Sequence, residues 1–248
     1  MSHQKQKQMT KIFSCSYNLF QVNTYTLFKE GNSKCVVIDP GFSTAEEKQH
    51  FYSILQQQGL KVEAVLLTHA HFDHIFGVKD LQKDFNASVL MHAAEEQQLA
   101  YCEKMGSRYG LDTPDTTWAF STIEDGQELE LAGLKIKVIT TPGHSPGSVS
   151  FYLADDDILI SGDTLFAGSI GRSDLPGGEY DDEIRSIMEK LILLPPQTEV
   201  FPGHGPSTTI DNERTGNPFL EPFNEKEELE PLNREELEPI VLSSNTIS

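Results

Sequence analysis

The stretch that decides the fold of this chain is Thr68-His69-Ala70-His71-Phe72-Asp73-His74. Four of its seven residues, three imidazoles and one carboxylate, are of types that bind metal ions. Residues two apart share a face of an extended chain but not of a helix, so we expect His69 and His71 on extended backbone. The apolar run at 62–67 before them is typical of a short buried strand. We therefore predict a metal-binding loop beyond a strand end, with His69 and His71 on one metal and Asp73 and His74 on a second.

Three more candidate ligands follow predicted strand ends later in the chain. His144 lies in Thr-Pro-Gly-His-Ser-Pro-Gly at 141–147, and His204 lies in Pro-Gly-His-Gly-Pro at 202–206. Asp163 follows an apolar run at 158–160. Core histidines seldom need glycine and proline on both sides, so these turns favour a binding role. Asp39, just beyond another predicted strand, is either a hydrogen-bond partner of a ligand histidine or a turn former before Pro40-Gly41.

Composition limits the partners that this chain is expected to have. Its 248 residues carry a formal net charge of -19, with a pI near 4.7. This charge argues against a nucleic-acid surface and against an anionic membrane surface, so we expect a small-molecule partner. Cys15, Cys35 and Cys102 are odd in number and widely spaced, which argues against a disulfide framework. With no transmembrane run and no signal-peptide core, we predict a cytoplasmic protein and leave its oligomeric state open.

The chain divides into three predicted parts. Residues 1–10 are a polar, flexible leader, 11–219 form one domain, and 220–248 form an acidic tail. The tail repeats Glu-Glu-Leu-Glu-Pro at 227–231 and 235–239, which favours a solvated extension over a docking segment. Within the domain we predict the strands 25–28, 35–38, 62–67, 88–91, 129–131, 134–140, 149–153, 158–160 and 199–201. The first predicted helix is capped by Thr44, runs to about Gln58 and is ended by Gly59. The other predicted helices are 75–85, 93–102 and 181–194.

The order of these motifs resembles that of the metallo-β-lactamase superfamily, in which an HxHxDH box is followed by His, Asp and His on later loops. The resemblance covers about residues 11–219. It implies an α/β (α+β) fold, a four-layer αβ/βα sandwich with the metals at one edge of two central sheets. It also implies ligand roles: His69, His71 and His144 on the first metal, Asp73, His74 and His204 on the second, and Asp163 between both.

The donor set indicates which metals the site would take. Five imidazoles and two carboxylates with no thiolate suit two divalent ions, zinc first, with iron or manganese as alternatives. Such a pair can supply a hydroxide at neutral pH and polarise a carbonyl. The carboxylates Asp73 and Asp163 are therefore our catalytic candidates.

Within the superfamily the chain looks most like the short bacterial glyoxalase II-like proteins, which are similar to hydroxyacylglutathione hydrolases. The motifs that carry this likeness are Gly-Asp-Thr-Leu-Phe at 162–166, Gly-Arg-Ser-Asp at 171–174 and Asn-Pro-Phe at 217–219. Full-length glyoxalase II has Lys and Tyr, which contact glutathione, at the positions of Arg172 and Asp174, and it has a further helical domain. Arg172 is thus either a partner for a substrate carboxylate, with Arg108 or Lys104 nearby, or an internal ion pair with Asp174 or Asp163.

The leading functional hypothesis is hydrolysis of S-acylglutathione-type thioesters. A thiol with a pKa near 8.5 leaves without a strong general acid, and the motifs show metal ligands but no spare acid. The alternative from another class is a persulfide dioxygenase, which binds one iron, here through His69 or His71 with His144 and Asp163. Lactonases and phosphodiesterases share the metal box and remain alternatives. The lack of an export signal argues against a β-lactamase. Seven candidate ligands argue against a non-catalytic binding module.

Overall fold

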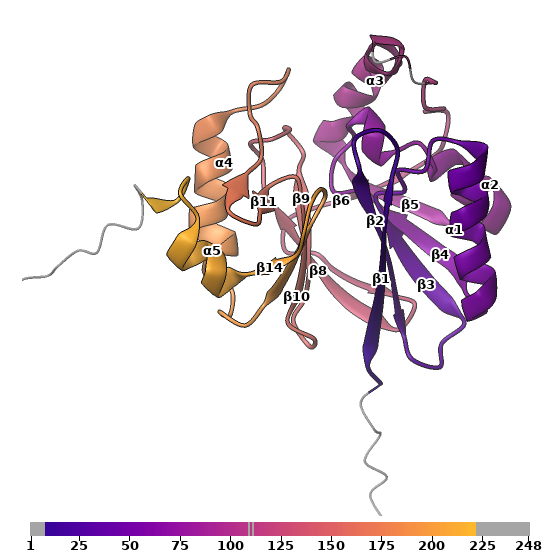
Figure 1. The fold of residues 1–248 in the computed structure, drawn as a ribbon, viewed down its shortest axis with the longest axis horizontal. Coiled ribbons are helices and arrows are strands. Elements are labelled where there is room, and N and C mark those ends of the chain that lie inside the picture. The colour runs from indigo at the N-terminus through magenta and orange to yellow at the C-terminus, as the bar shows by residue number, and fades with distance from the viewer. Residues whose placement is uncertain (1–7, 109, 111, 222–248) are drawn as a thin grey trace, which may run out of the picture.

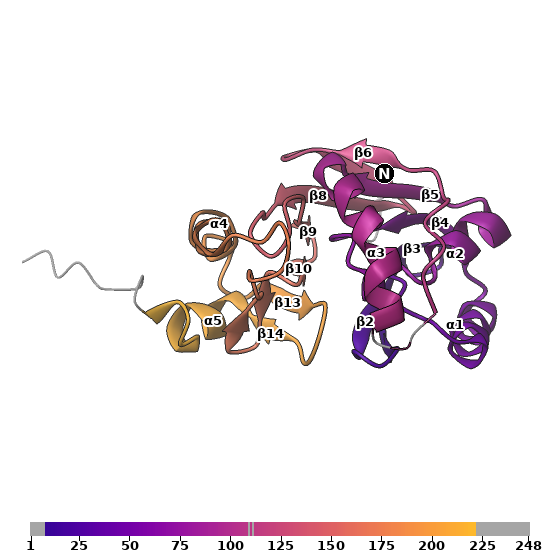
Figure 2. The same cartoon turned by 90° about the horizontal axis from the view of Figure 1, so that it is seen from above.

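Two six-stranded sheets lie face to face at the centre of the molecule, with helices on the outside of each (Figure 1). The computed structural model describes residues 8–108, 110 and 112–221, and of residues 103–107 it describes the backbone but not the side chains. Seen from above, α1 and α2 lie on one side of the sheets and α4 and α5 on the other (Figure 2). This is the predicted α+β sandwich of four layers.

The first sheet has the strand order β1-β2-β3-β4-β5-β6. Antiparallel pairing joins β1 to β2 and β2 to β3, and parallel pairing joins β3 through β6. The strands are β1 (Thr10–Tyr17), β2 (Val22–Lys29), β3 (Lys34–Ile38), β4 (Lys61–Leu66), β5 (Ser88–His92) and β6 (Ser121–Ile123).

The second sheet has the order β14-β13-β10-β9-β8-β7, in which only β10 and β13 pair in parallel. Its strands are β7 (Glu128–Leu131), β8 (Leu134–Thr140), β9 (Val149–Leu153), β10 (Ile158–Gly162), β13 (Glu199–Pro202) and β14 (Thr208–Thr209). A small hairpin, β11 (Leu165–Phe166) with β12 (Ser169–Ile170), follows β10.

The helices divide between the two sheets. Packed against the first are α1 (Ala45–Gln58), α2 (Val78–Phe85) and α3 (Glu96–Arg108), with 3₁₀ turns at Phe72–His74 and Ala93–Glu95. Packed against the second are α4 (Tyr180–Ser186), a π-helical turn at Ile187–Leu191, and α5 (Ile210–Gly216).

Three hydrophobic clusters hold the four layers together. Alternation along β3 shows how one strand serves two of them: Val36 and Ile38 face the cluster between the sheets, whereas Cys35 and Val37 face the cluster under the helices. A strand buried on both faces is apolar at successive positions, which explains the continuous hydrophobic runs of β3 and β4. The third cluster lies between the second sheet and α4 and α5.

The start of α1 is as the sequence predicts. The Thr44 hydroxyl accepts from the Glu47 N–H at 3.1 Å, and the Glu47 carboxylate accepts from the Thr44 N–H at 3.2 Å. This reciprocal pair is a capping box. Gly59, with a φ of 64°, ends the helix in the left-handed conformation.

Several predicted boundaries were wrong. Thr10, which we placed in the leader, is the first residue of β1, a strand that we did not predict, and it pairs with Lys29. The helix predicted at 75–85 begins at Val78, because the 3₁₀ turn through His74 comes first. In the same way a 3₁₀ turn takes up 93–95, and α3 continues past 102 to Arg108. The helix predicted at 181–194 changes to π geometry at Ile187.

The far ends of the chain are only partly described. Residues 1–7 and 222–248, which include the repeat of the predicted tail, lie outside the described residues. Leu220, which we assigned to the tail, is buried in the third cluster, and its N–H donates to the Asn217 carbonyl at 3.1 Å. Among the described residues, no helix has both the length and the apolar character needed to cross a membrane.

Candidate metal centre

The seven predicted ligands meet at one edge of the two sheets. His69 and the 3₁₀ turn Phe72–His74 follow β4 from the first sheet, and His144, Asp163 and His204 follow β8, β10 and β13 from the second. Four of the seven residues, His69, Asp73, His74 and His144, are buried. His71, Asp163 and His204 are partly buried, and the side chains of Asp163 and His204 are 11% and 28% exposed. The structure therefore brings together residues that are up to 135 positions apart, from His69 to His204.

The first group of possible ligands contains His69, His71 and His144. Their ligand atoms lie within 4.8 Å of one another, a spacing that suits a single metal ion. His144 Nε2 and His71 Nδ1 are 2.9 Å apart. These are the three residues that the resemblance assigns to the first metal.

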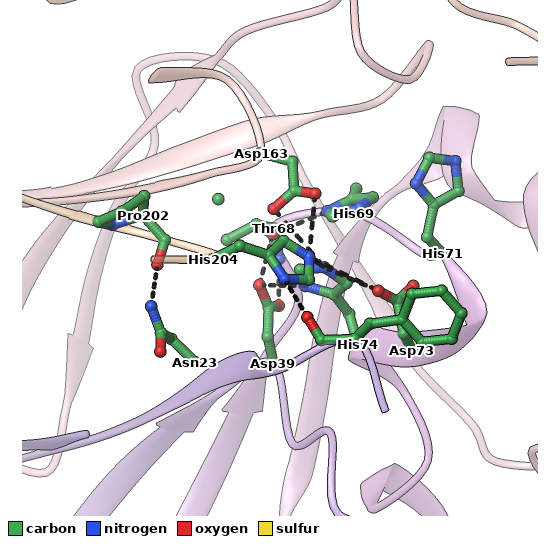
Figure 3. Close-up of polar contacts among 12 residues, drawn as sticks. Asn23, Asp39, Thr68, His69, His71, Asp73, His74, Asp163, Pro202 and His204 are labelled. Atoms are coloured by element: carbon green, nitrogen blue, oxygen red, sulfur yellow. Dashed lines mark hydrogen bonds and ion pairs between the residues drawn. The ribbon is translucent and has the colours of Figure 1, made fainter. Parts of the chain in front are cut away.

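The second group contains Asp73, His74 and His204, also within 4.8 Å of one another. His74 Nε2 is 3.4 Å from His204 Nε2, and Asp73 Oδ2 is 3.6 Å from His204 Nε2 (Figure 3). The 3₁₀ turn places Asp73 and His74 side by side, which is how two successive residues reach one point.

Asp163 lies between the two groups. Its Oδ2 is 3.7 Å from His144 Nε2 in the first group, and its Oδ1 is 3.6 Å from His74 Nε2 in the second. Oδ2 is also 3.4 Å from His204 Nε2 (Figure 3). A carboxylate in this place can contact ions in both groups at once.

Each imidazole that points its Nε2 into the site has its Nδ1 engaged elsewhere. His69 Nδ1 is 3.0 Å from the Thr68 hydroxyl, and His74 Nδ1 is 3.0 Å from Asp39 Oδ2. Backbone carbonyls accept from the other two: Arg172 O from His144 at 2.7 Å and Phe20 O from His204 at 2.9 Å. Such contacts fix the tautomer and the ring orientation of a metal ligand.

Asp39 combines the two roles that the sequence left open. Its φ of 49° is the left-handed conformation of a turn residue, and its carboxylate also contacts His74. Its Oδ1 accepts from the Thr68 N–H at 2.8 Å and its Oδ2 from the Thr68 hydroxyl at 2.6 Å. Asp39, His69 and His74 also form a compact group of ligand types, but the contacts to Thr68 and to His74 Nδ1 indicate an orienting role for Asp39.

The protonation of His69 and His71 suits metal binding. Burial lowers the pKa of His69 well below its ordinary value, and the neighbouring His74 and His71 lower it further. Burial and His144 together lower the pKa of His71 to about 3. Both imidazoles are therefore neutral at pH 7, the form in which a ring nitrogen can bind a metal.

The Asp163 carboxylate, which lies between the two groups, is ionised. Burial alone would raise the pKa of Asp163, but the adjacent His74 and His204 lower it well below its usual range. The pKa of His74 rises in return: burial opposes its charge, yet Asp163 and Asp73 outweigh that cost. The negative charges of Asp73 and Asp163 therefore lie close to the imidazoles of His74 and His204.

Two buried atoms show that the residues fit a metal. Five buried side-chain atoms among the described residues have no hydrogen-bond partner, and two of them, His69 Nε2 and Asp163 Oδ1, belong to candidate ligands. Buried polar atoms in native proteins are nearly always paired, so these two call for a partner of another kind. The oxygen and imidazole donors around them match zinc, iron or manganese.

A cavity of about 420 Å³ opens over the two groups. Candidate ligands from both groups line it, namely His71, Asp73, His144, Asp163 and His204. The rest of its lining is mostly apolar and comes from the β1–β2 turn, the 3₁₀ turn Phe72–His74, α3, β11 and the loop after β12; it includes Phe20, Phe72, Tyr101, Phe166, Leu175 and Pro176.

Arg172, our candidate substrate residue, also lines this cavity. Its guanidinium makes two 2.8 Å contacts to Asp174, the internal pair that we gave as the alternative. Arg108 is exposed at the end of α3, and the side chain of Lys104 lies outside the described residues.

Sequence reasoning missed the residues that hold the ligand loops. Asn23 Nδ2 donates to the Pro202 carbonyl at 3.0 Å (Figure 3). It also donates to the Gly205 carbonyl at 2.8 Å, and the Tyr25 hydroxyl donates to Pro202 O at 2.6 Å. Both come from β2 of the first sheet and hold the His204 turn of the second. Asn23 and Tyr25 are about 180 residues from Pro202 in the sequence, and no local pattern marks them.

A third such residue is Glu183 on α4, which is fully buried. Its Oε2 accepts from the His144 N–H at 2.7 Å. Burial raises the pKa of this carboxyl to about 9, although the His144 N–H opposes the shift. Glu183 thus holds the His144 turn from the helical side.

The model of the metallo-beta-lactamase superfamily matches residues 17–204, which include every candidate ligand. The chain belongs to the metallo-beta-lactamase superfamily. Proteins of this family bind metal ions and include hydrolases, in agreement with the His and Asp groups described above. The resemblance inferred from the motif order is confirmed.

Two curated relatives extend over most of the chain. The probable metallo-hydrolase YqgX of Bacillus subtilis is 40% identical over 206 residues, covering 82% of this chain and 94% of that protein. The hydroxyacylglutathione hydrolase GloC of Haemophilus influenzae is 32% identical, covering 81% of this chain and 93% of that protein.

Solved structures show the same fold. TTHA1623 in a di-iron-bound form has a TM-score of 0.75 at 37% identity and covers 84% of this chain and 100% of its own. The B3 metallo-beta-lactamase BLEG-1 has a TM-score of 0.75 at 35% identity and covers 86% of this chain and 99% of its own. The name of one of these structures gives an activity, β-lactamase, and that of the other gives a metal, two bound iron ions.

Proposed function

We propose that this metallo-hydrolase is a binuclear enzyme that cleaves thioesters, with S-acylglutathione compounds as the first substrate class. The observation that carries the proposal is the position of Asp163. Its two oxygens lie 3.7 Å from His144 of one ligand group and 3.6 Å from His74 of the other. A shared carboxylate between two nitrogen-rich groups is the arrangement that two adjacent ions require.

Each group has a defined part in binding the ions. His69, His71 and His144 would hold one divalent ion and Asp73, His74 and His204 the other, with zinc first and iron or manganese as alternatives. A pair of such ions supplies a nucleophilic hydroxide at neutral pH and polarises a carbonyl oxygen. The ionised Asp163 stays in place because His74 and His204 flank it.

The cavity supports the choice of substrate class. The apolar walls suit an acyl group and exclude water from the reacting carbonyl, while Arg172 at the rim would contact a substrate carboxylate. A thiolate is a good leaving group, so the reaction needs no general acid beyond the metal centre. The hydroxyacylglutathione hydrolase GloC, at 32% identity, further supports a thioester.

The test is hydrolysis of S-lactoylglutathione by protein whose bound metals have been counted. We expect turnover at two metals per chain and loss of at least about a hundredfold on Asp163→Ala. Retained turnover in folded Asp163→Ala protein would contradict the mechanism. Two metals without turnover would refute the glutathione thioester, and a panel of other thioesters, esters, lactones and β-lactams would then identify the substrate. One iron per chain, together with oxygen uptake when glutathione persulfide is added, would refute the hydrolase and support the persulfide dioxygenase.

A further inference from the structure

Glu95 is a buried acid that belongs to none of the ligand groups. It is the last residue of the 3₁₀ turn Ala93–Glu95, just before α3, and its exposed fraction is 0%. Burying a carboxylate is costly unless donors compensate it, so the contacts of this side chain reveal its role.

Three short hydrogen bonds reach the Glu95 carboxylate from two different loops. Oε2 accepts from the Ala70 N–H at 2.7 Å. Oε1 accepts from the Ser145 hydroxyl at 2.7 Å and from the Gly147 N–H at 2.7 Å. One carboxylate therefore joins the loop after β4 to the loop after β8.

Both loops carry ligands of the first group, directly beside the bonded residues. Ala70 lies between His69 and His71, and Ser145 follows His144. The three histidines come from different sheets, and their relative position depends on what spans the gap between the loops. Glu95 spans it with one oxygen on each side.

Close packing leaves Glu95 little freedom. A Cβ on Gly147 would lie 3.0 Å from Glu95 Cγ and 2.8 Å from His92 Nδ1, so only glycine fits there. The backbone of the His144 loop is thus in direct contact with the acid. Movement of the Glu95 carboxylate would be passed on to the loop.

We propose that Glu95 is a positioning residue that sets the distance between His144 and the His69–His71 pair, and thereby the metal affinity of the first group. The inference rests on the proposed metal centre, but not on the reaction that it performs. Residues that orient metal ligands typically change metal affinity by 10- to 100-fold when they are replaced.

The main test is Glu95→Gln, which keeps the size of the side chain. Its amide offers one acceptor oxygen and a donor NH₂, so it cannot accept on both sides at once. We expect zinc affinity, measured by chelator competition without substrate, to fall about 10- to 100-fold. Ser145→Ala removes one of the three donors and should produce a smaller loss in a less perturbed fold.

The affected group can be identified by combining variants. In His204→Ala protein, where the second group is weakened, Glu95→Gln should still lower zinc affinity. In His144→Ala protein, where the first group is already broken, Glu95→Gln should add no further loss. An equal loss in both backgrounds would overturn the assignment to the first group.

Glu213 provides the matched control. It is also buried and also accepts three hydrogen bonds, from Gly168 N at 2.9 Å, Thr208 Oγ1 at 2.7 Å and Asn217 Nδ2 at 2.8 Å. None of these partners is a candidate ligand or an immediate neighbour of one. Glu213→Gln should lower the melting temperature and leave zinc affinity unchanged.

Two further results would refute the proposal. One is wild-type zinc affinity in Glu95→Gln, and the other is an equal loss of affinity in Glu213→Gln. Because zinc binding is read without substrate, absence of thioesterase activity would refute the proposed function and leave this inference standing.

Discussion

The guanidinium of Arg172 and the carboxylate of Asp174 face each other in a two-point ion pair, with Nε–Oδ1 and Nη2–Oδ2 both at 2.8 Å. Both side chains are exposed, at 61% and 70%. Because the pair is exposed to solvent, we expect a substrate carboxylate to compete with Asp174 for the arginine. Arg172 also lines the cavity over the two ligand groups.

Asp174→Asn should release Arg172 toward an anionic substrate. We expect KM for a glutathione thioester to fall about two- to fivefold, with kcat unchanged, since surface pairs contribute little. Arg172→Ala should raise the same KM. A neutral thioester serves as the control, because neither change should affect it. An Asp174→Asn enzyme with unaltered KM for the anionic substrate would show that Arg172 does not bind its carboxylate.

Asp39→Asn should weaken the second group of ligands. Asparagine tolerates the positive φ of this position, so the turn is kept. Its amide cannot accept from Thr68 and from His74 at both oxygens, as the carboxylate does. We expect metal affinity to fall about 10- to 100-fold with the fold intact. Two tightly bound ions in the variant would contradict the orienting role of Asp39.

Gly203→Ala should disturb the Asp163 carboxylate directly. A Cβ at this position would overlap Asp163 Oδ1 and lie 2.9 Å from His74 Cε1. Displacing a catalytic group by about 1 Å can cost about a hundredfold in rate, and we expect a loss of this order together with weaker metal binding. Gly216→Ala is the control, because a Cβ there meets nothing within 4 Å. Equal activity of the two variants would place Asp163 outside the reaction.

Two of the three free cysteines should resist modification in the folded protein. Cys35 and Cys102 are buried, and burial raises the pKa of each thiol to about 12. The thiolate is the reactive form of cysteine, and a raised pKa means that it forms only at higher pH. At pH 8 only about one in 10⁴ of these thiols is ionised. A colorimetric thiol count at pH 8 should find Cys15 alone in the native protein and all three after unfolding. Two fast-reacting thiols in the native state would contradict this.

The sequence alone identified the candidate ligands and much of the framework. His69, His71, Asp73 and His74 are close together in the chain, so their spacing on extended backbone and a short turn already indicates a metal site. The Gly and Pro residues around His144 and His204 mark their turns, and Thr44 and Gly59 mark the ends of α1. These signals are local, and local chemistry can be read from neighbouring residues.

Other features of the site were decided by the tertiary structure. Glu95, Asn23 and Glu183 carry no local signal, because each acts on a loop between 25 and 182 residues away. Arg172 had two possible partners in the sequence, and only the folded loop shows that it pairs with Asp174. Strand β1 was missed because its residues are half-buried at an edge, so its hydrophobic pattern is weak. Contacts across two packed sheets depend on the position of every strand, and sequence spacing does not contain that information.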